Sequence, residues 1–489
     1  MAKPSREAVT GLLAGPAALA VAGMLVNGCN LLMNLIVARS LDPDSYGAVS
    51  VQVSIFLILS VAGNALLIAV VQHETSGPGG TRREQWSWIR RLRGACGVGI
   101  AISAIVAVVL CRPVAALMSY PHPLAIAEAT IGAALWTLLC VERGLLQARG
   151  AYPRLAVNFV VEGFVRIGLV IVLVLGGLGV NGAGLGIVLG VVVGAEHARW
   201  AVTRTPRLPR PPASQRGAPA SQRGAPVSQR GAPVLPDDGT PPATGPIPLP
   251  IPAPRASARQ SVIADTTVAL GALIPLALLQ NMDVVIVGWL GSSGVGGYAA
   301  ISTACKVPVF IGLAVANFLL PEAARRRKEG RPAGGTLVVA LVFVVAPGLF
   351  LAGLGLFAAK WLIGLVFGAH LTAAASALSV LALSMTLLAV TLMFTTYLLG
   401  AGVRRVVGVL AVATVATAGA LVSAGGGSMA TATAALAAES VTALAVGLLV
   451  VQLHHADRRV ARVAETHRRP AGDMGLPNPQ PGEGVPARV

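Results

Sequence analysis

Long apolar segments separated by short polar ones recur along the whole chain. Twelve of them carry almost no charge, and each is long enough to cross a hydrocarbon layer about 30 Å thick as an α-helix. The predicted spans are residues 15–38, 47–71, 94–118, 124–146, 155–177, 181–203, 261–287, 296–320, 336–357, 373–399, 405–424 and 429–453. The pattern predicts an all-α polytopic membrane protein with about twelve transmembrane helices.

Positive charges alternate between the loops that join these segments. They gather in the even-numbered loops, whereas odd-numbered loops such as LDPDSYG and GSSGVGG carry almost none, with Lys360 as the main exception. The even-numbered loops hold, among others, Arg82, Arg83, Arg90, Arg91, Arg93, Arg149, Arg154, Arg325, Arg326, Arg327, Lys328, Arg404 and Arg405. The positive-inside rule therefore places both termini in the cytoplasm and predicts a multi-pass protein of the cell membrane.

Composition agrees with this interpretation. Only 12% of the 489 residues are charged, against about 25% in soluble proteins, and 55% are hydrophobic. The net charge of +17 is then a consequence of topology, and we expect no nucleic-acid partner. The partners expected from composition alone are membrane lipids.

One internal segment has a different composition. Residues 204–260 contain three tandem SQRGAP units followed by a proline-rich stretch, which cannot bury enough apolar surface to fold. We predict a disordered cytoplasmic linker between an N-terminal six-helix bundle (1–203) and a C-terminal one (261–453), with a disordered cytoplasmic tail at 454–489. The linker is either a passive tether or a site that binds partners through its prolines.

The two halves resemble each other. NLLMNLIVARSLDPDSYGAVS begins at Asn30, and NMDVVIVGWLGSSGVGGYAAIS begins at Asn281; each is a polar-studded helix, a short turn, a tyrosine and a second helix. Because six helices is an even number, both halves enter the membrane from the same side. The two bundles are therefore predicted to be a parallel repeat, which is an architecture of transporters.

No segment of the sequence has the features of a catalytic domain. None of the four lysines follows a glycine, so a nucleotide-binding P-loop is excluded. The five cysteines show no C-x-x-C spacing and are expected to be reduced and buried, so we expect no metal and no cofactor. The protein is predicted not to be an enzyme.

Charged residues inside the spans are the candidates for function, because they are costly in hydrocarbon. Arg166 lies in the fifth span one turn after Glu162, and the pair is either an internal salt bridge or an anion-binding group with Glu162 as its resting partner. Lys306 has no acidic neighbour on its own helix, so it snorkels, meets a partner on another helix or faces a cavity. Arg39 ends the first span and is expected to be an interfacial anchor or a contact for substrate.

Acidic and amide groups lie in the second half. Glu439 has no basic neighbour on its own helix, so it is either a proton-binding group or a carboxylate satisfied by packing. Asn281 and Asp283 come just before the turn GSSGVGG and Tyr298. Asp283 is either part of the transport site or, as we favour, a hydrogen-bonding anchor for that turn.

These motifs resemble one family. The turn ARSLDPDSYG (with Ala38, Arg39, Leu41, Tyr46 and Gly47), the segment QNMDVVIVGWLGSSGVGGYAA and the later LIGLVFGAHLTAAASAL are similar to those of polysaccharide flippases of the multidrug/oligosaccharidyl-lipid/polysaccharide exporter superfamily. The resemblance implies that the protein flips a lipid-linked oligosaccharide, on an anionic isoprenoid phosphate or diphosphate, to the outer leaflet for envelope polysaccharide synthesis. It also implies alternating access of two bundles, with Arg166, Lys306 and Arg39 as candidates for binding the cargo. Partners that bind the linker would then belong to polysaccharide assembly.

Two other functions remain open at this point. A cation-coupled multidrug exporter of the same superfamily would need a carboxylate deep in its cavity, and acidic residues are sparse in the first half. A membrane scaffold that uses its linker to bind partners has only the linker in its favour. Basic residues in the spans favour an anionic cargo.

Overall fold

The computed structural model describes residues 16–76, 82–205, 258–291, 294–328 and 334–468. The SQRGAP repeats of the predicted linker and the last part of the predicted tail lie outside these residues. Within them, all regular secondary structure is helical. The prediction of an all-α membrane protein is confirmed.

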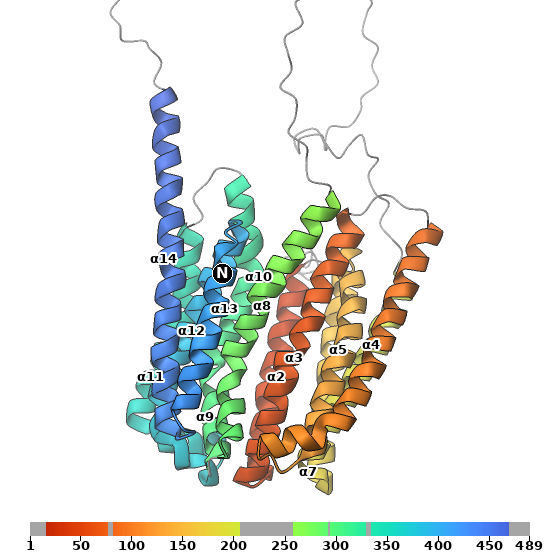
Figure 1. The fold of residues 1–489 in the computed structure, drawn as a ribbon, viewed down its shortest axis with the longest axis vertical. Coiled ribbons are helices and arrows are strands. Elements are labelled where there is room, and N and C mark those ends of the chain that lie inside the picture. The colour runs from red at the N-terminus through yellow and green to blue at the C-terminus, as the bar shows by residue number, and fades with distance from the viewer. Residues whose placement is uncertain (1–15, 77–81, 206–257, 292–293, 329–333, 469–489) are drawn as a thin grey trace, which may run out of the picture.

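The helices form two bundles that stand side by side (Figure 1). The N-terminal bundle contains α2 (Pro16–Ser40), α3 (Pro43–Ser76), α4 (Arg82–Leu117), α5 (Pro123–Ala148), α6 (Tyr152–Leu173) and α7 (Gly179–Thr203). The C-terminal bundle contains α8 (Ala258–Trp289), α9 (Val295–Cys305), α10 (Val307–Lys328), α11 (Gly334–Val366), α12 (Leu378–Gly400), α13 (Arg405–Ser423) and α14 (Ser428–Arg468). Two short helices, η1 (Val174–Leu178) and η4 (Ala369–Ala377), precede α7 and α12.

These elements make twelve crossings in the part of the chain that the structure describes. Eleven segments are long and apolar enough to span a membrane, and one of them, Tyr152–Thr203, has 52 residues. A straight helix of that length would be more than twice as long as the hydrocarbon layer is thick. Gly177 (φ 92°) and Gly179 (φ 52°) interrupt it with backbone angles that favour glycine, so α6 and α7 pack against each other as two crossings.

Several helices extend beyond the predicted spans. Helix α4 begins at Arg82, so the arginines between 82 and 93 form its first turns and not a loop. Helix α11 continues through a kink at Ala358 to Val366, which places Lys360 in a helix, whereas we expected it in a loop. Helix α14 continues to Arg468, so the prediction of a disordered tail from residue 454 is wrong up to that point. Apolar patterns locate the membrane layer, but helices end where backbone hydrogen bonding ends.

The predicted eighth span is divided in two by Lys306. Pro308 follows and has no N–H to donate, which breaks the hydrogen-bond ladder between α9 and α10. The Lys306 N–H bonds back to Ser302 at 3.2 Å, and the Phe310 N–H donates to the Lys306 carbonyl at 3.0 Å. The lysine thus occupies a helix break and is only 8% exposed.

The two bundles meet at the end where α3 and α9 begin, which we call the turn end. A Cβ added at Gly47 would lie 2.9 Å from the Gly296 nitrogen, and one at Gly296 would collide with the carbonyl of Pro43. The Trp289 indole donates to the Leu117 carbonyl at 3.2 Å. The two tyrosine–glycine turns of the repeat therefore lie against each other and close this end.

Candidate functional site

A cavity of about 330 Å³ lies between the two bundles. Residues of α2, α3, α6, α7, α8, α10 and α12 line it. Its polar lining consists mainly of carboxamides. The polar lining residues are Asn27, Asn30, Asn34, Ser60, Asn64, Arg166, Gln280 and Asn281. The rest is apolar and includes Phe56, Leu57, Phe310, Leu313 and Leu392.

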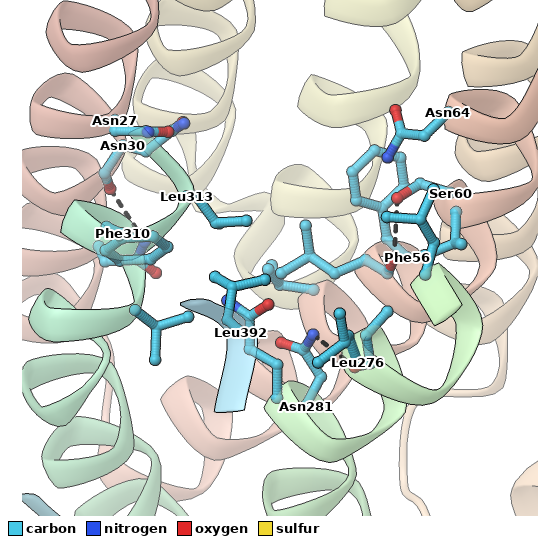
Figure 2. A pocket seen from close by; sticks show the side chains of 18 of the residues that line it. Asn27, Asn30, Phe56, Ser60, Asn64, Leu276, Asn281, Phe310, Leu313 and Leu392 are labelled. Carbon is cyan, nitrogen blue, oxygen red and sulfur yellow. Dashed lines mark hydrogen bonds between the residues drawn. The ribbon is translucent and has the colours of Figure 1, made fainter. Parts of the chain in front are cut away.

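The carboxamides surround the cavity from both bundles. Figure 2 shows Asn27 and Asn30 on one side, Ser60 and Asn64 on the other, and Asn281 lower in the view. The side-chain amides of Asn34 and Asn281 donate to carbonyls of their own helices, Asn30 at 2.9 Å and Ala277 at 3.0 Å. Each carboxamide combines donors with an acceptor, so the cavity can hydrogen-bond a ligand rich in hydroxyl groups.

In the described part of the chain, Arg166 is the only charged residue that lines the cavity. Its Nε donates to Glu162 Oε1 at 2.7 Å, which confirms the i,i+4 contact expected from the sequence. The arginine side chain is 12% exposed and the glutamate 1%. The cavity therefore presents a guanidinium, while its carboxylate partner is covered.

A second arginine binds the same carboxylate. Arg143 Nη2 lies 3.2 Å from Glu162 Oε2, and Arg143 Nε donates to Asn158 Oδ1 at 2.8 Å. Its guanidinium carbon lies 4.0 Å from the ring centroid of Phe159 and 5.2 Å from that of Trp136. Sequence reasoning missed Arg143, because it lies on α5 and contacts α6 only after the bundle has assembled.

A row of glycines on α7 brings this network together. Gly182, Gly186, Gly190 and Gly194 recur every four residues and so lie on one face of the helix. A Cβ at Gly194 would lie 2.5 Å from Glu162 Cγ, and one at Gly190 would collide with the Cβ of Arg166. We call these four residues the glycine ladder; it allows α6 and α7 to approach so closely that the charged side chains lie between them.

We expect Gly190→Ala to destabilise the protein by about 1–3 kcal/mol, because the added methyl group must displace the backbone or side chain of Arg166. Gly168→Ala is the matched control, since Gly168 is on α6 and has nothing within 4 Å of an added Cβ. Thermal unfolding of both variants in detergent measures the difference. Equal midpoints would contradict close packing at the ladder.

The structure places Lys306 away from the cavity lining. Its Nζ donates to Asn281 Oδ1 at 3.2 Å, and the Asp283 carboxylate lies within electrostatic range. Asp283 Oδ2 accepts hydrogen bonds from Ser302 at 2.9 Å and from Tyr298 at 3.3 Å. Asp283 therefore links α8 to α9 through the side chains of Ser302 and Tyr298.

Glu439 on α14 is 3% exposed and belongs to the same buried region. It lies within electrostatic range of Asp283. Within the described residues, Glu439 Oε2 and Asp283 Oδ1 have no hydrogen-bond partner. Among the described residues of the C-terminal bundle, the Asp283 carboxylate thus lies near both Lys306 and Glu439.

Arg39 also lies outside the cavity lining. At the end of α2 it donates through Nε to the Val366 carbonyl at 3.1 Å, and through Nη2 to the Leu365 carbonyl. His370 Nε2 lies 3.0 Å from the Ala38 carbonyl. These contacts join the last turns of α2 and α11 across the two bundles at the turn end, so Arg39 helps to close that end.

Of the six carboxamides, Asn281 was a candidate from the sequence and the other five were missed, although the sequence carried a signal for three of these. Asn27, Asn30 and Asn34 follow each other at spacings of three and four, which places them on one face of the first span. Asn64 and Gln280 give no such signal, because single polar residues in long spans do not reveal which way they face. Only the packing of the bundles brings these side chains to one cavity.

No protein-family model and no curated protein matches the sequence. Several solved structures do match. A multidrug resistance MATE family transporter of the MOP superfamily, in an inward-facing conformation, has a TM-score of 0.56 at 16% identity, over 89% of this chain and 99% of its own. The chain has the fold of such transporters.

Two further matches are a lipid flippase and a second MATE transporter. The lipid II flippase MurJ, in an inward closed conformation, has a TM-score of 0.64 at 10% identity, over 88% of this chain and 87% of its own. A mutant of the Vibrio cholerae MATE transporter VcmN has a TM-score of 0.55 at 16% identity, over 91% and 95%. The fold of the MOP superfamily, two bundles of six helices, is the one predicted from the sequence. It agrees equally with drug export and with lipid flipping.

Proposed function

We propose that the protein moves a lipid-linked oligosaccharide, carried on an anionic isoprenoid phosphate or diphosphate, to the outer leaflet of the cell membrane by alternating access of its two bundles. The observation that carries this proposal is the chemistry of the cavity. Among the residues that the structure describes, six carboxamides and one arginine line it, and no carboxylate does. Polysaccharide synthesis at the cell envelope is the process that would use such a product.

The two kinds of polar group suit the two parts of the cargo. Carboxamides both donate and accept, so they can replace the water that a sugar loses when it enters the membrane layer. A guanidinium binds phosphate oxygens with paired, charge-assisted hydrogen bonds. Apolar residues such as Leu57 and Leu313, each 39% exposed, leave room for the start of an isoprenoid chain.

The same chemistry argues against the alternative of a cation-coupled drug exporter. A cationic drug in this cavity would face Arg166 with no carboxylate to offset the repulsion among the lining residues. Two acidic groups of the C-terminal bundle, Asp283 and Glu439, are 2% and 3% exposed. They are covered and do not line the cavity.

Transport in this direction can draw on the membrane potential. Moving one charge through 100 mV is worth about 2.3 kcal/mol, so an anion that leaves an interior at negative potential is driven outward. The contacts of Arg39 with α11 at the turn end would have to open for release. Glu439, with a buried oxygen that has no partner, is our candidate for a proton-binding group that is coupled to this opening.

The proposal is tested with purified protein in proteoliposomes. The probe is a short-chain isoprenyl diphosphate that carries one fluorescently labelled sugar, and transfer between leaflets is read by reduction of the fluorophore from outside. We expect transfer well above that of empty liposomes, faster with the interior made negative when the probe leaves the inner leaflet.

Ethidium uptake in the same liposomes tests the alternative. Transport of ethidium with no transfer of the diphosphate would overturn the proposal in favour of drug export. Transport of neither compound by correctly folded protein would favour the scaffold.

A further inference from the structure

We infer that Arg143 neutralises Glu162 and thereby keeps the charge of Arg166 free for an anionic ligand in the cavity. Arg143 would then be a positioning residue that never touches the cargo. The nature of the ligand rests on the proposed function; the charge arrangement does not.

The geometry divides the carboxylate between two cations. Glu162 Oε1 accepts from Arg166 at 2.7 Å, and Oε2 accepts from Arg143 at 3.2 Å. One negative charge therefore faces two positive ones, and the triad carries a net charge of one positive unit. A pair of Glu162 and Arg166 alone, as the sequence suggests, would have been neutral.

The other acidic residues described on α5 have partners of their own and do not neutralise Arg143. Its neighbour in sequence, Glu142, is bound on both oxygens by Arg93 at 2.6 Å. Glu128 on the same helix accepts from Gln52 at 3.0 Å. Among the described residues, Glu162 is the carboxylate that forms an ion pair with Arg143.

The surroundings of the two arginines differ in a way that separates their roles. Arg143 is 1% exposed, is held by Asn158, and has the rings of Phe159 and Trp136 against its guanidinium. It cannot reach a ligand. Arg166 is the partly exposed member and lines the cavity, so the excess charge of the triad is presented there.

This arrangement gives each buried charge a partner and still leaves the cavity positive. An unpartnered buried charge is costly, whereas a fully neutralised arginine would bind an anion only weakly. With two arginines on one carboxylate, each guanidinium has a partner while the cavity remains positive. Glu162 holds Arg166 in place, and Arg143 cancels the charge that Glu162 would otherwise impose on it.

The experiment measures the charge of the cavity without any cargo. Leu57→Cys places a reporter thiol in the cavity, and its reaction rates with anionic sulfonatoethyl and cationic trimethylammonioethyl methanethiosulfonate are compared in the full-length protein. The protein with only its five native cysteines gives the background. The ratio of the two rates cancels differences in thiol reactivity and accessibility that affect both reagents alike.

Four variants are compared with the wild-type background. Arg143→Met removes the inferred counter-charge, and Arg143→Lys keeps it. Arg143→Met with Glu162→Gln removes both charges and leaves Arg166 positive, while Glu162→Gln alone tests the carboxylate. Membrane abundance and size-exclusion profiles show which variants fold.

We expect Arg143→Met to lower the ratio of anionic to cationic rates about tenfold, about threefold for each reagent in opposite directions. Arg143→Lys and the Arg143→Met/Glu162→Gln double variant should both restore it. A purely structural effect would change access to both reagents alike and would leave the ratio of their rates unchanged. An unchanged ratio in Arg143→Met, or a lowered ratio that the double variant does not restore, would overturn the inference.

If Arg143→Met does not fold, Glu162→Gln and the double variant decide together. A ratio that rises in Glu162→Gln and returns to the wild-type value in the double variant supports the inference, and equal ratios in all three backgrounds overturn it. The result is also independent of the proposed function. A ratio that falls and recovers as expected, in a protein that does not transfer the isoprenyl diphosphate, would support the charge arrangement and overturn the flippase proposal.

Discussion

Replacing Arg166 by glutamine is expected to reduce transfer of the sugar-linked isoprenyl diphosphate about ten- to a hundredfold, with little loss of stability. A hydrogen bond to a charged group is worth about 1.5–3 kcal/mol, which corresponds to this range. Folding should tolerate the change, because Glu162 remains bonded to Arg143. From the sequence alone this variant would have left a buried carboxylate without a partner, so the second arginine makes it a clean test.

The control is Arg199→Gln, which removes an exposed arginine that pairs with Glu196 on the same bundle. It should leave both transfer and stability unchanged. Arg166→Lys keeps the charge but not the paired donors and should retain part of the activity. Full transfer by a well-folded Arg166→Gln protein would contradict the role of the cavity charge.

Lys306→Met is expected to have the opposite profile, with a large loss of stability. Removal of one partner from a buried ionic group typically costs about 3–5 kcal/mol. Asp283 would lose the cation in its surroundings, and Asn281 would lose the donor at 3.2 Å. Membrane abundance and thermal unfolding in detergent should both fall below those of Arg166→Gln.

A second change should compensate for the first. In Lys306→Met/Asp283→Asn the carboxylate charge is removed, while an acceptor for Ser302 or Tyr298 remains, so most of the stability should return. If Lys306→Met instead folds normally and only transport is lost, the lysine acts on the cargo, as the sequence first suggested. Comparison of Arg166→Gln with Lys306→Met thus distinguishes a residue that binds the cargo from one that stabilises the fold.

The membrane layer and the two bundles could be predicted because they depend on long-range averages: apolar length, arginine alternation and the repeat around Tyr46 and Tyr298. The ends of helices could not. Helix α4 continues through arginines and α14 through a polar stretch, since a helix outside the membrane satisfies its own hydrogen bonds whatever its side chains.

The candidate site was predictable only in part. Arg166 and Glu162 lie on one helix four residues apart, so their contact follows from helix geometry. The contact of Arg143 with Glu162 joins two helices and depends on how they rotate about their axes. Lys306 was correctly recognised as lacking a partner on its own helix, but which of three solutions it takes depended on the break before Pro308 and the position of Asn281.

The glycine ladder restricts how this protein can vary during evolution. At Gly190 and Gly194 even a methyl group would collide with Arg166 and Glu162, so no other residue type fits at either position. Gly168, Gly408 and Gly419 have open space around them, so we expect other residues to replace them in related sequences. Among related sequences we expect the ladder positions to be invariant wherever the arginine–glutamate pair is present, and to relax together where it is lost.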